Sequence, residues 1–235
     1  GGKKQVDMLR KLRITAAFIL FTGLTLLFLD FTGTIHAYLG WMAKIQFLPA
    51  LLASNLFVVV SILLFTILFG RLYCSIICPL GIFQDIVAWI TERRKKNRYS
   101  FKKNRKWLRY GIAAAFIILL IFGFSSIAFV IAPYSIYGKI ASNIFSPIYT
   151  LINNALAYFA ERIDSYAFYS VEVYIKSLPA FIIAVFYFIL ISMSAVLFGR
   201  GYCNTVCPIG AILSVFAKKS LLKPHFNDKC VSCGL

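Results

Sequence analysis

The chain has 235 residues, of which 60% are hydrophobic and only 14% are charged, and its mean hydropathy is +0.82. This composition excludes an ordinary soluble domain and indicates an integral membrane protein. The net charge of +17 suggests nucleic acid. However, the basic residues cluster beside apolar segments and no nucleic-acid-binding module is present, so we expect them to mark cytoplasmic loops and expect no nucleic-acid partner. Gly1-Gly2 resembles the remnant of a cleaved tag and carries no functional signal.

Four apolar segments are each close to the ~20 residues that a transmembrane helix needs. The first is not a signal peptide, because no small-residue cleavage site follows it. Two further apolar segments, at 80–90 and 209–217, are too short to span and predict interfacial or re-entrant helices. The long segment 134–178, rich in Tyr and Phe, predicts one or two helices on the outer surface. The four expected spans are residues 14–29, 47–69, 107–130 and 179–198.

A twelve-residue motif occurs twice, at residues 70–81 and 199–210, with an offset of 129 residues. Both copies contain Gly-Arg, then Tyr-Cys, then Cys-Pro and a final glycine, so each has the form C-x₃-C-P. A match of this length is not expected by chance. We interpret it as an internal repeat whose thiols meet at one site. The motif cysteines are Cys74, Cys78, Cys203 and Cys207.

The basic residues are distributed unequally along the chain. If the N-terminus, residues 92–106 and the C-terminus lie on one side, that side holds 21 of the 25 Lys and Arg residues. The positive-inside bias makes that side cytoplasmic. Both motifs then lie at the cytoplasmic ends of the second and fourth spans. Each half has the order span, span, motif, short helix, which predicts a parallel repeat about an axis along the membrane normal.

The predicted fold is therefore an all-α integral membrane protein with four transmembrane helices, arranged as two parallel helix-pair repeats. Both termini are expected in the cytoplasm, and the protein is expected to be multi-pass. The divisions are membrane repeat 1 (12–91), a basic cytoplasmic loop (92–106), membrane repeat 2 (107–220) and a linker with the start of a further domain (221–235).

The second cysteine of each motif precedes a proline. Proline is favoured at the first position of a helix and disfavours helical backbone in the residue before it. Cys78 and Cys207 are therefore expected at helix N-caps, where backbone N–H groups favour a thiolate of lowered pKa. Arg71 and Arg200, three residues before the first cysteine of each copy, add positive charge. This arrangement suits a thiolate-bound metal centre whose net charge is negative.

Other positions in and beside the motifs carry weaker signals. Gly81 and Gly210 would allow another part of the backbone to approach closely. Tyr73 and Tyr202 recur before the first cysteine, but tyrosine is also a common anchor at membrane interfaces. Asp85 has no counterpart in the second copy, because a serine takes its place. That difference argues against an essential shared role for Asp85.

Four thiolates fit a [4Fe–4S] or a [2Fe–2S] cluster, but the residues leave other centres open. Zinc binds cysteine pairs of C-x₂₋₄-C spacing, although usually in soluble knuckles. Soft thiolates also bind Cu(I), and disulfides would be disfavoured on a face in contact with the reducing cytosol. A radical S-adenosylmethionine site is excluded, because no third cysteine follows the C-x₃-C pair at the required spacing.

The end of the chain carries a second cysteine pattern. Cys230 and Cys233 match the opening of the ferredoxin run C-x₂-C-x₂-C-x₃-C-P. The chain stops one residue before the third cysteine would fall, so we expect a ferredoxin domain that is cut short. A zinc ribbon or two free thiols are the alternatives. His225 is interpreted as a linker residue and His36 as an interfacial residue that could contact a quinol.

The two C-x₃-C-P motifs at span ends, followed by a ferredoxin-type run, resemble the membrane-bound polyferredoxins, a 4Fe-4S-binding family. That family includes quinol-dehydrogenase subunits of periplasmic nitrate reductase systems, nitrous-oxide reductase regulators and cupric reductases of oxidase assembly. The resemblance covers about residues 12–233 and implies an integral electron carrier of bacterial inner membranes. It also implies that the four motif cysteines are the redox or metal residues, and that Cys230 and Cys233 are the first two ligands of a ferredoxin cluster.

The main hypothesis is a membrane-bound iron–sulfur protein that passes electrons between the cytoplasm or the quinone pool and a membrane or periplasmic redox partner. This makes it an electron-transfer component of an oxidoreductase system, and no catalytic residue is assigned. A second hypothesis is a copper-binding or cupric-reductase protein that supports metalloenzyme assembly. A third is a structural anchor that docks redox subunits through segment 134–178. The expected partners are the lipid bilayer, redox proteins and a quinol.

Overall fold

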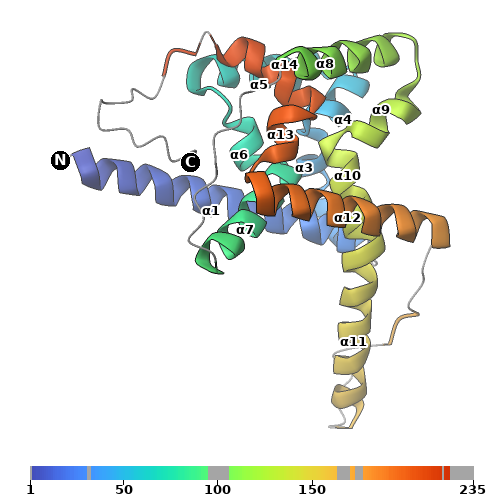
Figure 1. Cartoon of the computed structure of the whole chain (residues 1–235). Coiled ribbons are helices and arrows are strands. Elements are labelled where there is room, and N and C mark those ends of the chain that lie inside the picture. The colour runs from blue at the N-terminus through green and yellow to red at the C-terminus, as the bar shows by residue number, and fades with distance from the viewer. Residues whose placement is uncertain are drawn as a thin grey trace.

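The computed structural model of the chain describes residues 2–30, 33–94, 106–162, 170–172, 177–218 and 220–222. All regular secondary structure in these ranges is helical, which confirms the all-α prediction (Figure 1).

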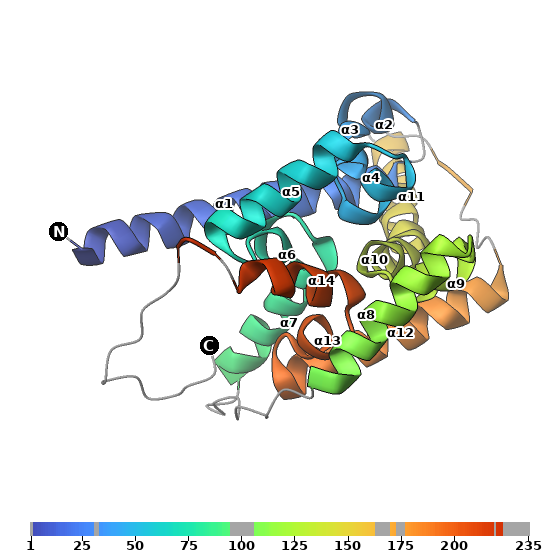
Figure 2. The same cartoon turned by 90° about the horizontal axis from the view of Figure 1, so that it is seen from above.

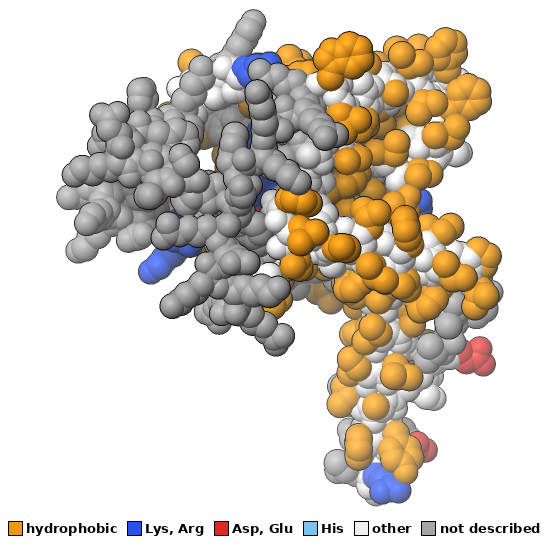
Figure 3. All heavy atoms as spheres, viewed as in Figure 1, with side chains coloured by type: hydrophobic (Ala, Val, Ile, Leu, Met, Phe, Trp, Pro, Cys, Tyr) orange, Lys and Arg blue, Asp and Glu red, His pale blue; other side chains and the backbone are white. Residues whose placement is uncertain are grey.

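Among the described residues, two helical stretches are long and apolar enough to cross a bilayer. They are Met8–Leu29, within α1 (Gly2–Leu29), and α12 (Leu178–Phe198), with mean hydropathies of 2.0 and 2.7. At ~1.5 Å per residue, each covers the ~30 Å thickness of bilayer hydrocarbon. Many of their apolar side chains face outward; Phe18 is 66% exposed and Phe186 is 60% exposed. Figure 3 shows apolar side chains over much of the described part of one face, which suits lipid better than water.

The second expected span, residues 47–69, is divided into two helices. These are α4 (Phe47–Leu52) and α5 (Leu56–Phe69). Between them, Ser54 has a φ of 53°, and the Asn55 side chain accepts a hydrogen bond from the N–H of Val58 at the start of α5. A positive φ interrupts the helical backbone, so this stretch is not one continuous span.

The third expected span, residues 107–130, is divided in the same manner. It falls in α8 (Lys106–Ile121) and α9 (Ser125–Ile131), with Gly123 between them at a φ of 78°. Glycine adopts this left-handed conformation without steric cost and commonly ends a helix. The structure therefore differs from the four-span expectation at these two places.

Each cysteine motif forms a short helix followed by a proline-initiated helix. In the first copy these are α6 (Tyr73–Ile76) and α7 (Pro79–Arg94), and in the second they are α13 (Gly201–Thr205) and α14 (Pro208–Ala217). Both helices that were expected after the motifs are present. α7 extends to 16 residues and so is longer than expected, whereas α14 closely matches the predicted stretch.

The motif helices lie inside the molecule, between the long apolar helices. α14 packs against α5 and α8, and α7 packs against α12 and α10. Figure 2 shows α6, α13 and α14 between α5 on one side and α8 and α12 on the other. In the same view α1 and α8 run in one general direction, and α5 and α12 run back in the other. The motifs that follow α5 and α12 are thereby brought to the same end of the helices.

The segment after residue 132 forms a long, nearly continuous helical rod whose last part projects from the rest of the molecule (Figure 1). This confirms helices within the expected segment 134–178. Residues 163–169 and 173–176 lie outside the described part. The remaining helices are α2 (Thr34–Leu39), α3 (Trp41–Lys44), α10 (Pro133–Ile140), the π-helix η1 (Ala141–Phe145) and α11 (Ser146–Glu161).

Some of the predictions concern residues that the structure does not describe. Most of the basic loop, residues 95–105, is one such stretch, and residues 223–235 are another. The second stretch contains His225, Cys230 and Cys233. The expected ferredoxin pattern therefore stays a prediction from the sequence.

Candidate metal centre

A glycine turns the chain out of a long apolar helix at the start of each motif. Gly70 ends α5 with a φ of 75°, and Gly199 ends α12 with a φ of 64°. Other residue types rarely adopt this conformation. The short helices α6 and α13 follow at once and place the first cysteine of each motif, Cys74 and Cys203, in the protein interior.

The second cysteine of each motif lies at the start of the next helix, as the Cys-Pro pairs predicted. Cys207 is the N-cap of α14 in extended conformation, and its Sγ accepts a hydrogen bond from the N–H of Gly210 at 3.3 Å. Cys78 directly precedes Pro79, the first residue of α7, and the nearby backbone N–H groups of Gly81 and Leu80 act to lower its pKa. In the second copy an otherwise unpaired N–H of the first helical turn is thus satisfied by sulfur.

The last glycine of each motif allows the close approach that the sequence predicted. A Cβ on Gly81 would lie 2.2 Å from the carbonyl oxygen of Cys74, and a Cβ on Gly210 would lie 2.7 Å from that of Cys203. Both distances are far below van der Waals contact. The same contact in both copies holds the proline-initiated helix tightly against the turn that carries the first cysteine.

The four motif thiols lie together in one buried core. They are between 3% and 8% exposed and belong to a single cluster of packed side chains. Charge on either thiol of the first motif, Cys74 or Cys78, would act on both Cys203 and Cys207 of the second. Among the described residues, no three Cys, His, Asp or Glu side chains converge tightly enough to hold a single metal ion. The thiols therefore share a core without forming a closed single-ion site.

The prediction of lowered thiol pKa values is wrong. Burial raises the pKa of all four thiols, and that of Cys78 to about 12, because a buried thiolate loses its hydration. The N-cap hydrogen bonds and the nearby arginines act in the predicted direction, but burial outweighs them. As buried thiolates, these sulfurs would need a bound cation to compensate their negative charge. Binding of that cation would release the thiol protons.

The motif arginines connect the two copies. Arg200 forms a two-point ion pair with Asp85 of α7, in which Nε donates to Oδ1 at 2.6 Å and Nη2 donates to Oδ2. Arg71 Nη1 donates to Oδ1 of Asn204 at 3.3 Å. The positive charges of Arg71 and Arg200 also act to lower the pKa of Cys74. Asp85 thus has a role that the second copy does not repeat, because Arg71 pairs with an amide and not with a carboxylate; this agrees with the expectation that Asp85 has no shared role.

The motif tyrosines fix the motifs in place and do not anchor the surface. Tyr73 and Tyr202 are 5% and 6% exposed. The Tyr73 hydroxyl donates to Oε1 of Gln46 at 3.1 Å and accepts from the N–H of Phe47 at 2.9 Å. The Tyr202 hydroxyl donates to the carbonyl oxygen of Ile131 at the end of α9. Each motif is thus tied to the end of another helix.

Three buried polar side chains near the motifs were missed by sequence analysis. Gln46 bridges Tyr73 and the carbonyl oxygen of Ile77, and Gln84 is fully buried with neither amide atom hydrogen bonded. Arg109 of α8 donates to the carbonyl oxygen of Gly210 at 2.7 Å. Arg109 had a weak signal at most, since it is the one charge within the expected span 107–130 but lies only three residues after the basic cluster that ends at Lys106.

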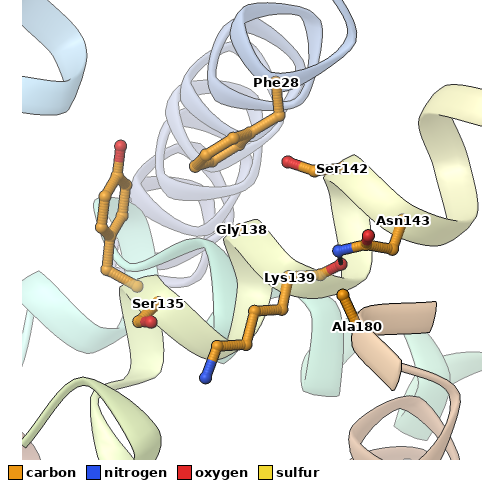
Figure 4. Close-up of a pocket in the computed structure, with 8 residues that line it drawn as sticks. Phe28, Ser135, Gly138, Lys139, Ser142, Asn143 and Ala180 are labelled. Atoms are coloured by element: carbon orange, nitrogen blue, oxygen red, sulfur yellow. Dashed lines mark hydrogen bonds between the residues drawn. The ribbon is translucent and has the colours of Figure 1, made fainter. Parts of the chain in front are cut away.

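Two cavities in the described part of the chain lie apart from the cysteines. One, of about 360 Å³, lies between α1, α10, η1 and α12; Phe28, Lys139 and Asn143 are among its lining residues (Figure 4). There the Asn143 side chain donates to the carbonyl oxygen of Lys139 at 2.9 Å. A second, apolar cavity of about 380 Å³ lies between α4, α8 and α14. Neither is lined by a motif cysteine.

His36 is exposed, and its proposed contact with a quinol stays a prediction.

Comparison with known proteins places both motifs in one kind of domain. The 4Fe-4S binding domain family matches residues 51–98 and 179–227, and each match contains one C-x₃-C-P motif. No solved structure matches the chain.

Three relatives represent the similar proteins found. An uncharacterised protein of Methanocaldococcus jannaschii is 22% identical, over 98% of this chain and 80% of its own length. The methylamine utilization ferredoxin-type protein MauN of Paracoccus denitrificans is 22% identical, over 84% of this chain and 55% of its own. The ferredoxin-type protein NapH of Haemophilus influenzae is 25% identical, over 74% of this chain and 48% of its own. The chain thus spans about half the length of these two ferredoxin-type relatives. The comparisons support iron–sulfur electron transfer, but they do not support copper or quinone binding.

Proposed function

We propose that this chain is a membrane iron–sulfur electron carrier with one cluster held by both motifs, because the 4Fe-4S binding domain family matches both motifs and similar proteins are ferredoxin-type proteins. The observation that carries the proposal is the shared burial of four thiols from two separate motifs in one core. The proposed ligands are Cys74, Cys78, Cys203 and Cys207.

The donor set fits an iron–sulfur cluster better than a single ion. Four thiolates are the usual ligands of a [4Fe–4S] cluster. When bound, such a cluster would accept and release one electron. A single zinc ion would need its sulfurs about 2.3 Å away, and such convergence is absent among the described residues. A cluster distributes the thiolates over several iron atoms, so its ligands stand farther apart. The thiols can therefore be close neighbours without converging on one point.

The surrounding residues have distinct parts in this proposal. Arg71 and Arg200 offset the negative charge of the thiolate ligands, and the packed helices exclude water from them. Gly81 and Gly210 let each proline-initiated helix close over its motif. These are the features that a buried redox centre needs to remain stable in both oxidation states.

We further propose four membrane crossings, with both motifs at the cytoplasmic face and both termini in the cytoplasm of a bacterial inner membrane. The alternating directions of α1, α5, α8 and α12 in Figure 2 support this arrangement. Four crossings would also place 21 of the 25 Lys and Arg residues on the cytoplasmic side, as the positive-inside bias favours. Electrons would then pass between the cytoplasm or a quinone pool and a redox partner in the membrane or the periplasm. Cys230 and Cys233 would begin a second, ferredoxin-type site.

The direct test is metal and acid-labile sulfide analysis of the chain purified anaerobically from iron-supplied cells. We expect iron and sulfide together, with an absorbance or EPR signal that Cys74→Ser and Cys207→Ser each abolish. The control is the double variant Cys230→Ser with Cys233→Ser, which should keep the iron of the membrane site. Iron-free wild-type protein would contradict the proposal, and about one copper per chain without sulfide would favour the metal-handling alternative.

A further inference from the structure

Arg109 of α8 is a buried positive charge beside the second motif, although it belongs to neither motif. It is 5% exposed, and its Nη2 donates to the carbonyl oxygen of Gly210, three residues after Cys207. Its Nε–H has no hydrogen-bond partner, and no carboxylate in the described part of the chain forms an ion pair with it. Burying a guanidinium group without an anionic partner is strongly unfavourable. We therefore expect a negative charge near Arg109 that compensates its burial.

A second arginine makes the charge of Arg109 less favourable still. Arg71 lies within electrostatic range of Arg109, and two like charges repel. The hydrogen-bond partner of Arg71 is the neutral amide of Asn204, whereas Arg200 has a carboxylate partner in Asp85. Two guanidinium groups without carboxylate partners in the described part of the chain are thus placed near one another.

Both of these arginines act on the thiols. Arg109 lies within electrostatic range of Cys74 of the first motif and Cys207 of the second, and Arg71 acts on Cys74. The missing anionic partner is therefore most simply supplied by the thiolates themselves, once they are ionised around a bound centre. Arg109 is held to the second motif by Gly210, yet its charge reaches the first motif as well.

We propose that Arg109 is the electrostatic partner of the cysteine centre, and that its positive charge raises the reduction potential of a cluster bound there. This inference rests on the proposed function. Reduction by one electron adds negative charge to the centre, so a fixed positive charge nearby stabilises the reduced form more than the oxidised form. Arg109 acts through space and through the Gly210 carbonyl, and it is a positioning residue, not a ligand.

The test is an EPR-monitored redox titration of the full chain purified anaerobically, with iron and sulfide measured on the same samples. Arg109→Gln keeps an N–H donor for the Gly210 carbonyl but removes the charge, and we expect its midpoint potential to be more negative than that of the wild type. Arg109→Lys keeps the charge, and its potential should stay close to the wild-type value. Arg13→Gln, which changes an exposed arginine of α1, should leave the potential unchanged.

The midpoint potentials and cluster contents of these variants test whether the charge of Arg109 acts on the cluster. Equal midpoint potentials for the wild type and Arg109→Gln would overturn the inference. It would also be overturned if Arg109→Lys shifted the potential, or lost the cluster, as much as Arg109→Gln, because the shape of arginine would then matter and not its charge. If Arg109→Gln failed to load a cluster while Arg109→Lys loaded one, the charge would be required for assembly, in support of the inference. Wild-type protein without iron and sulfide would instead contradict the proposed function, and the role of Arg109 with it.

Discussion

Gly81 and Gly210 set how closely each proline-initiated helix can approach its cysteine turn. The space that a Cβ would need at either position is occupied by a backbone carbonyl oxygen. A side-chain neighbour could rotate away, but a backbone oxygen moves only if the helix or the turn moves. Since the same carbonyl belongs to Cys74 or Cys203, any such movement displaces a proposed ligand.

We expect Gly81→Ala and Gly210→Ala to destabilise the protein by about 1–3 kcal/mol each, the usual cost of overpacking, and to lower its iron content. Gly111→Ala is the matched control, because Gly111 lies in helix α8 and a methyl group added there would have nothing within 4 Å. That change should stabilise α8 by up to about 1 kcal/mol. The measurement is unfolding in detergent together with iron analysis. Equal behaviour of the three variants would show that the close contacts are unimportant.

The pair of Arg200 and Asp85 links two elements that are distant in the sequence. Asp85 belongs to α7 of the first copy, and Arg200 is the second residue of the second motif, 115 residues later. The two side chains are 31% and 39% exposed, so solvent screens part of their attraction. The two-point geometry nevertheless favours arginine over lysine, because only the planar guanidinium group can bind both carboxylate oxygens.

We expect Asp85→Asn and Arg200→Gln each to lower the free energy of unfolding by about 1 kcal/mol, the upper end for an exposed pair. The exchange variant, Asp85→Arg combined with Arg200→Asp, should recover part of this loss because it restores opposite charges. A double-mutant cycle in detergent measures the coupling. A coupling energy of zero would mean that the pair does not hold α7 to the second motif.

The molecule as a whole is compatible with two membrane topologies. Two helical stretches, Met8–Leu29 and Leu178–Phe198, are long enough to cross by themselves. If the N-terminus is cytoplasmic and only these two cross, the basic loop 92–106 lies on the outer side. If α4 with α5 and α8 with α9 also cross, the same loop lies in the cytoplasm, where the positive-inside bias favours it. The location of this loop therefore distinguishes the two topologies.

We expect a fluorescent reporter inserted after Arg98 to be active in the cytoplasm, and alkaline phosphatase inserted after Ser165 to be active in the periplasm. The physical reason is the concentration of Lys and Arg in the loop 92–106, which strongly opposes translocation. Insertions that retain the iron content of the wild type would be compared. Alkaline phosphatase activity from a second insertion after Arg98, with no fluorescence from the first, would contradict the proposed four-span topology and favour two crossings.

Much of the local structure around the cysteines was predictable from the sequence. Cys-Pro pairs predicted helix starts at Pro79 and Pro208, and both helices begin there. Proline constrains its own φ and the residue before it, so this signal needs no tertiary contact. The close approaches at Gly81 and Gly210 are also local, because the carbonyl oxygen that a Cβ would meet belongs to the same motif, seven residues earlier. The recurrence of the motif predicted that both copies would have the same local fold.

The partners of the site residues and the ionisation of the thiols depended on the tertiary structure. The contacts from Arg200 to Asp85 and from Arg109 to Gly210 join residues 115 and 101 positions apart, and no periodicity in the sequence encodes such pairings. The thiol pKa values follow from burial, which several helices create together, so an argument from one helix N-cap predicted the wrong direction. Short-range backbone constraints thus specified each cysteine turn, whereas packing between distant segments decided its charge environment.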